Sequence, residues 1–173
     1  MRLWEDKNKN SYSVDPPTTY LTFAYWIFMV PQYKPKNILI HGYGGGTTAG
    51  LIRLIYGDAP ITGVDLDQCE NQYNVNLIQA DAKEFVKTCE EYDCVIVDLY
   101  HTDYTEPCDF VASPDFVKDL ERISNYLIVN TLHSEMSAYN HLRKIGHNKA
   151  SGCAEVISYY LIKGEIPNLH PYK

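Results

Sequence analysis

The feature that most restricts the fold is a glycine-rich run placed directly after a short apolar segment. Residues 37–41 read Asn-Ile-Leu-Ile-His, which is typical of a buried strand, and Gly42-Tyr-Gly-Gly-Gly46 follows at once. Residues 47–56 carry apolar side chains at helical spacing, and Gly57 then supplies a helix stop. This order predicts a strand, a sharp turn that lets the backbone approach a ligand, and a helix.

The rest of the chain continues to alternate strands with helices. We predict strands at residues 61–65, 75–80, 93–99, 126–130 and 155–162. We predict helices at residues 20–29, from Asp81 to Cys89, from Ser113 onward and from Ser134 to Gly146. Such alternation predicts an α/β fold with a Rossmann-like, doubly wound, mostly parallel sheet of about six or seven strands.

The length of 173 residues suits one domain with its own core. We predict a polar N-terminal tail over residues 1–16 and a single domain over residues 17–173. The aromatic helix at Tyr20–Met29 is apolar all round, so we expect it to be buried or to lie in an interface. An exposed face on this helix would favour a homodimer.

Charge and composition argue against several classes of partner. The net charge of −7 disfavours a nucleic-acid surface. The five cysteines form no C-x-x-C pair, so we expect no metal site and a reducing compartment. The longest apolar run, residues 20–30, is too short to span a membrane. We therefore expect a cytoplasmic protein that acts on a small molecule.

The glycine turn is the first part of a predicted cofactor site. Amide groups at a helix start favour a carboxylate or a phosphate. The run fits G-x-G-x-G and lacks the third glycine of the dinucleotide pattern, because Thr47 occupies the next position. Asp65 ends the second strand, where an acid can accept both ribose hydroxyls of an adenosine. The predicted contacts in the turn are Gly42, Tyr43, Gly44 and Gly46.

Two further acids follow strands at the same predicted edge. Asp81 comes after the third strand, where it either receives an adenine amino group or caps the next helix. Asp98 ends the central strand, where a carboxylate could hold a cationic amine or take its proton.

The loop after Asp98 supplies the remaining candidates. His101 could act as a base near neutral pH, although a lone loop histidine is more often solvated. Asp103 could assist Asp98 in orienting or deprotonating an acceptor. Tyr100 and Tyr104 could wall an acceptor pocket or could simply cover the core.

The order of these motifs between residues 37 and 132 resembles the spermidine synthase family, within the class I S-adenosylmethionine-dependent transferases. The matching segments are residues 38–47, 63–67, 80–85, 92–98, 113–116 and 126–130. The resemblance implies the class I methyltransferase fold, with S-adenosylmethionine or its decarboxylated form as cofactor. It also implies adenosine contacts at Asp65, Leu66, Asp81 and Ala82, and it matches Asp98 to the family's catalytic aspartate.

Departures from the family pattern leave the reaction open. Spermidine synthases carry an acid within the glycine turn, and this turn has none; their second acid, three residues after the catalytic one, is His101 here. The segment before residue 37 is too short for the family's N-terminal β-domain, so we expect that domain to be missing. The leading interpretation is a methyltransferase acting on an amine or hydroxyl of a small molecule. The alternatives are aminopropyl transfer to a diamine and a non-catalytic or partner-dependent binding module.

Overall fold

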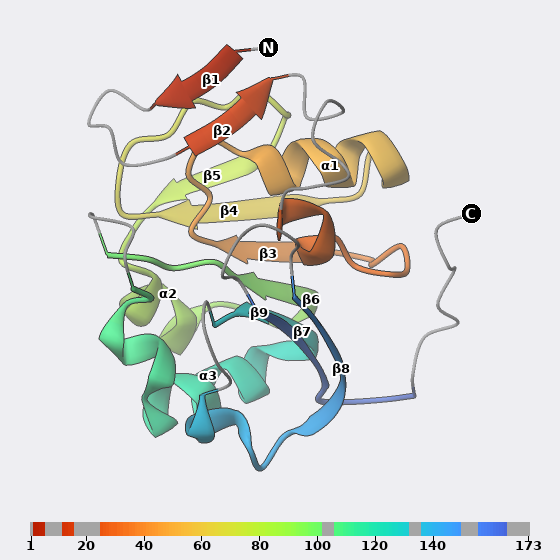
Figure 1. The fold of residues 1–173 in the computed structure, drawn as a ribbon, viewed down its shortest axis with the longest axis vertical. Helices are drawn as coiled ribbons and strands as arrows, with labels where there is room; N and C mark the ends of the chain where they lie inside the picture. Colours follow the sequence, from red (N-terminus) through yellow and green to blue (C-terminus); the bar gives the residue numbers. More distant parts are fainter. Residues whose placement is uncertain are drawn as a thin grey trace.

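The computed structural model describes residues 2–5, 12–15, 25–101, 106–131, 136–149 and 156–165. Seven strands form one sheet in the order β5-β4-β3-β6-β7-β9-β8 (Figure 1). They are β3 (Ile38–His41), β4 (Ile61–Asp65), β5 (Asn76–Gln79), β6 (Tyr92–Val97), β7 (Ser124–Asn130), β8 (Arg143–Lys149) and β9 (Val156–Leu161). All neighbouring pairs from β5 to β7 are parallel, and β9 runs antiparallel to β7 and β8. The predicted mostly parallel α/β sheet is confirmed.

The centre of the sheet is buried on both faces. β3 pairs with β4 and β6, so Ile38 lies opposite Ile61 on one side and Cys94 on the other. Every residue of β3 is buried, as expected for a strand covered from both sides. This explains why the central segments are continuous apolar runs without a polar alternation.

Helices cover the two faces in separate layers. Ile38 and Ile40 pack beneath α1 (Thr47–Tyr56) and the 3-10 helix η2 (Tyr25–Met29). Leu39 faces the other way, toward α2 (Ala82–Thr88) and α3 (Pro114–Ile123). The short 3-10 helices η3 (Asp109–Ala112) and η4 (Ser137–Tyr139) join this second layer.

Local capping explains where the helices begin and end. The Asp81 carboxylate accepts the Lys83 N–H at 2.8 Å at the start of α2. Ser113 caps α3, with Pro114 as its first residue. α1 ends at Gly57, whose φ of 69° suits glycine. These starts and stops agree with the sequence predictions.

The predicted helix from Ser134 to Gly146 is wrong. Ser134 lies outside the described residues, η4 covers only Ser137–Tyr139, and β8 begins at Arg143. The apolar residues that suggested a helix do pack inward, since Met136 and Leu142 lie against the core cluster that contains buried Tyr139. The Tyr139 hydroxyl donates to the Val111 carbonyl at 2.8 Å. Pairing of β8 with β9 then decides the conformation of the following residues.

The N-terminal region contains a small hairpin and a short helix. β1 (Arg2–Glu5) pairs antiparallel with β2 (Tyr12–Asp15) within the predicted tail. Of the aromatic helix predicted at residues 20–29, the structure describes η2, in which Met29 is fully buried. Among the described helices, none has the length and hydropathy needed to cross a membrane.

Candidate cofactor and catalytic site

The glycine turn lies at the carboxyl end of β3, at the centre of the sheet. Gly42, Gly44 and Gly46 have φ values of 82°, 53° and 80°, in the region that favours glycine. A Cβ on Gly42 would overlap the carbonyl of Asp98, so the turn passes directly against the end of β6. The turn therefore brings its own backbone and that of Asp98 together at one edge of the sheet.

Tyr43, predicted as a cofactor contact, turns its side chain into the core. Its ring packs against Gly46 and Gly63, where any Cβ would collide with it. Burial raises the pKa of its hydroxyl, which has no hydrogen-bond partner among the described residues. Tyr43 is therefore buried and packs against the turn, and the predicted cofactor contact at this residue remains a prediction.

Asp65 ends β4 beside the turn, as predicted. Its carboxylate accepts the Gly44 N–H at 2.8 Å and the Asp67 N–H at 3.1 Å. Burial raises its pKa, while these two N–H donors oppose the shift. Because an ionised carboxylate offers about four acceptor positions, Asp65 can hold the turn and still accept ribose hydroxyls.

The ends of β4 and β5 contribute an apolar and an acidic group to the same edge. Leu66 follows Asp65 and is 67% exposed, which is unusual for a large apolar side chain in a well-packed domain. Asp81 follows β5 and caps α2 through Oδ1, and its Oδ2 has no hydrogen-bond partner among the described residues. The capping role of Asp81 is confirmed, and the predicted adenine contact remains a prediction. Ala82 is buried in the first turn of α2.

Asp98 is held by donors from two other elements. Tyr25 of η2 donates its hydroxyl to Oδ2 at 3.0 Å, and Asn130 at the end of β7 donates its amide to Oδ1 at 3.0 Å. The Asp98 N–H also bonds to the His41 carbonyl at 2.9 Å. Two elements, η2 and β7, therefore hold this carboxylate with neutral side-chain donors, and β3 holds its backbone.

Sequence reasoning missed Tyr25 and Asn130. Asn130 carried one usable signal, since it ends a predicted strand and so belongs at the same edge as Asp98. Tyr25 carried none, because it lay in a segment crowded with aromatic residues.

The loop after Asp98 is only partly described. The Nε2 atom of exposed His101 lies 3.6 Å from the Asp109 carboxylate. The backbone N–H of His101 donates to the Glu106 carbonyl. Tyr100 forms an isolated bridge with Pro107. The predicted residues Asp103 and Tyr104 lie outside the described residues. The His101 ring lies against Asp109, and its catalytic role remains a prediction.

His41 is a further group that the sequence reasoning did not single out. It directly precedes Gly42 and is fully buried between the rings of Phe85 and Phe116, with centroids 6.1 and 6.2 Å away. Neither ring nitrogen has a hydrogen-bond partner among the described residues. Burial lowers its pKa to about 3, so the ring is neutral near pH 7.

Comparison with known proteins bears on the fold of the chain. No protein-family model matches the chain. A polyamine aminopropyltransferase from Vibrio vulnificus is 23% identical over 143 residues, covering 72% of this chain and 46% of that protein. The chain thus spans about half the length of this curated relative.

Solved structures show the same architecture at low sequence identity. Human methyltransferase-like protein 13, in complex with SAH, matches with a TM-score of 0.65 at 12% identity, over 88% of this chain and 84% of that one. The chain has the class I methyltransferase fold. A SAM-dependent methyltransferase from Aquifex aeolicus matches at 0.57 with 13% identity, over 94% and 100% of the two chains. Spermidine synthase from Thermotoga maritima shares this fold and matches at 0.56 with 15% identity, over 88% and 63%.

In the class I methyltransferase fold, the edge of the sheet described above is the one where ligands bind outside the strand ends. The structure brings the turn, Asp65 and Asp98 to this edge. These residues are far apart in sequence, but the parallel pairing of β4, β3 and β6 places the ends of these strands side by side.

Proposed function

We propose that this protein is an S-adenosylmethionine-dependent methyltransferase whose acceptor is an amine or hydroxyl of a small molecule. The observation that carries the proposal is the convergence of the Gly42–Gly46 turn, Asp65 and Asp98 at one sheet edge. The methyltransferase neighbours support the cofactor class.

The cofactor would lie across the ends of three strands. No acidic side chain stands in the glycine turn to repel the carboxylate of an intact amino-acid tail. The N–H groups of Gly42, Tyr43, Gly44 and Gly46 donate to Val64, Asp65 and Tyr43, so this absence of repulsion, and not these donors, favours the intact tail. Asp65 suits the ribose hydroxyls, and exposed Leu66 offers an apolar surface for the adenine ring. Asp81 Oδ2 would accept the adenine amino group.

Asp98 is the proposed catalytic residue. In methyl transfer, the acceptor's lone pair forms the new bond to the methyl carbon as the carbon–sulfur bond breaks, and the acceptor's proton must leave. An ionised Asp98 can orient that proton or receive it. Tyr25 and Asn130 are positioning residues, since each holds one carboxylate oxygen without neutralising its charge.

Aminopropyl transfer is the second candidate, and the Vibrio vulnificus relative favours it. The same Asp98 would then take a proton from a diamine. The diamine nitrogen would form a bond to the aminopropyl carbon as the carbon–sulfur bond breaks and methylthioadenosine leaves. The absence of an acid from the glycine turn weighs against this reading, because the decarboxylated cofactor carries a bare amine in place of a carboxylate.

Titration calorimetry of the full chain tests the proposal. We expect intact S-adenosylmethionine and S-adenosylhomocysteine to bind, decarboxylated S-adenosylmethionine to bind more weakly, and NAD not to bind. Preference for the decarboxylated form would overturn methyl transfer in favour of aminopropyl transfer. Tight binding of the intact form, without turnover on any amine or hydroxyl tested, would indicate a non-catalytic binding module.

A further inference from the structure

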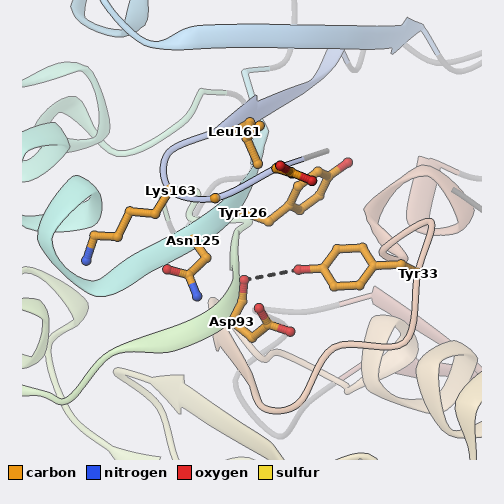
Figure 2. Close-up of a pocket in the computed structure, with 8 residues that line it drawn as sticks. Tyr33, Asp93, Asn125, Tyr126, Leu161 and Lys163 are labelled. Atoms are coloured by element: carbon orange, nitrogen blue, oxygen red, sulfur yellow. Dashed lines mark hydrogen bonds between the residues drawn. The ribbon is translucent and has the colours of Figure 1, made fainter. Parts of the chain in front are cut away.

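A cavity lies at the opposite end of the sheet from the glycine turn. Figure 2 shows it in close-up. It forms where β6 and β7 begin and where β9 ends, and its volume is about 370 Å³. Its lining residues are Tyr33, Asp93, Asn125, Tyr126, Leu161, Lys163, Gly164 and Glu165. Asp93 lies near the start of β6 and Asp98 just beyond its end, so this cavity is distinct from the proposed catalytic site.

Two tyrosine rings form a corner of the cavity. The rings of Tyr33 and Tyr126 meet edge to face, with centroids 5.4 Å apart and planes at 83°. Tyr33 is held in place because its hydroxyl donates to the Asp93 carbonyl at 3.1 Å, shown as the dashed line in Figure 2. Leu161 adds an aliphatic wall. Aromatic faces attract cations as well as apolar carbon.

The polar groups around these rings are mainly acceptors. Asp93 Oδ2 accepts the backbone N–H of Lys36 at 2.9 Å, and Asp93 Oδ1 has no hydrogen-bond partner among the described residues. The side chains of Asn125 and Glu165 also form no hydrogen bond or ion pair within the described part of the chain. Two carboxylates and one amide oxygen are therefore available at one cavity.

Lys163, the cation among the described lining residues, is already engaged. The Lys163 ammonium donates to the Arg122 carbonyl at 3.0 Å and lies 3.0 Å from the Glu91 carboxylate. Figure 2 shows its side chain extending away from Tyr33 and Asp93. Lys163 therefore leaves the negative charge of Asp93 and Glu165 uncompensated within the cavity.

We propose that this cavity binds a small primary amine in its ammonium form. Three N–H donors of an ammonium group match the available oxygens of Asp93, Asn125 and Glu165, and charge-assisted hydrogen bonds of this kind are the stronger ones. The short carbon chain of such a ligand would pack on the Tyr33–Tyr126 corner. A volume of about 370 Å³ is within the range of small-molecule sites.

Solution NMR of the full chain at pH 7 and constant ionic strength tests this site. We expect n-butylammonium chloride to cause saturable shifts of the backbone amides of Tyr33, Asn125 and Lys163. Tetramethylammonium, which has no N–H donor, and n-butanol, which has no charge, should each bind at least about tenfold more weakly, a factor equivalent to about 1.4 kcal/mol.

Variants separate the site from general charge effects. Asp93→Asn keeps an acceptor for the Lys36 N–H but removes the charge, and we expect it to weaken n-butylammonium binding about tenfold. Asn125→Ala removes a side chain that has no hydrogen-bond partner among the described residues, so it should weaken binding in a normally folded protein. The control Asp58→Asn removes one exposed negative charge elsewhere and should leave binding unchanged.

Three results would overturn the proposal. n-Butanol binding as tightly as n-butylammonium would make this an apolar crevice. Equal losses of affinity in Asp93→Asn and Asp58→Asn would mean that only net charge matters. If no saturable shifts appear at 50-fold molar excess and above, up to roughly 100 mM ligand, there is no site; binding at that concentration corresponds to only a few kcal/mol.

Discussion

Replacing His41 by leucine should stabilise the protein, and more strongly in acid. The side chain is fully buried against Phe85 and Phe116, and its two ring nitrogens lack partners among the described residues. Burying a polar group without its hydrogen bond costs about 1–3 kcal/mol. Leucine has a similar volume and no polar atom, so His41→Leu should recover part of this cost at pH 7.5.

The pH dependence gives a second and sharper expectation. The pKa of His41 is about 3 in the folded protein, below the ordinary value of 6.5. The unfolded chain therefore binds the proton more readily, and the wild-type protein loses stability as the pH falls from 6.5 toward 3. Linkage between these two values gives a loss of about 2 kcal/mol from this group at pH 5. The leucine variant lacks this loss.

Urea unfolding of both proteins at pH 7.5 and pH 5 measures the effect. The stability gained by His41→Leu should be larger at pH 5 by about 2 kcal/mol, because other titrating groups cancel in the difference. His147→Leu is the matched control, since His147 is exposed on β8 and should show no such increase. An equal gain for His41→Leu at both pH values would refute the reasoning and indicate a polar partner for the ring, such as a buried water.

Three more predictions concern the proposed cofactor edge. Gly42→Ala should lower the melting temperature far more than Gly164→Ala, since both glycines have φ near 80° but only Gly42 would overlap the Asp98 carbonyl; equal losses would mean that backbone strain alone matters. Asp65→Asn should weaken S-adenosylmethionine binding by about tenfold or more in calorimetry, because it removes the charge that holds the Gly44 N–H; unchanged affinity would place the ribose elsewhere. Asn130→Ala should lower the free energy of unfolding by about 1.5–3 kcal/mol in urea, since it removes a hydrogen bond to a charged group; no loss would show that Asp98 does not need this donor.

Local patterns in the sequence were enough to predict much of the fold. The glycine turn, the caps at Asp81 and Ser113 and the stop at Gly57 all depend on residues within a few positions of one another. The apolar runs predicted the parallel strands, and the rule that ligands bind at their carboxyl ends placed Asp65 and Asp98 at one edge. These inferences succeeded because backbone geometry and capping act over short distances.

Contacts between distant residues decided the rest. The hydrogen bonds of Asp98 join it to Tyr25, 73 positions away, and to Asn130, 32 positions away. Residues 143–149 form a strand because β9 lies beside them, although the spacing just before them suggests a helix. The sequence by itself determined the strand–turn–helix units and the edge where a cofactor would bind. Only the tertiary structure decided which donors hold Asp98, that buried His41 has no hydrogen-bond partner among the described residues, and that a cavity opens at the far end of the sheet. Packing and side-chain hydrogen bonds depend on proximity in space, which short sequence patterns do not give.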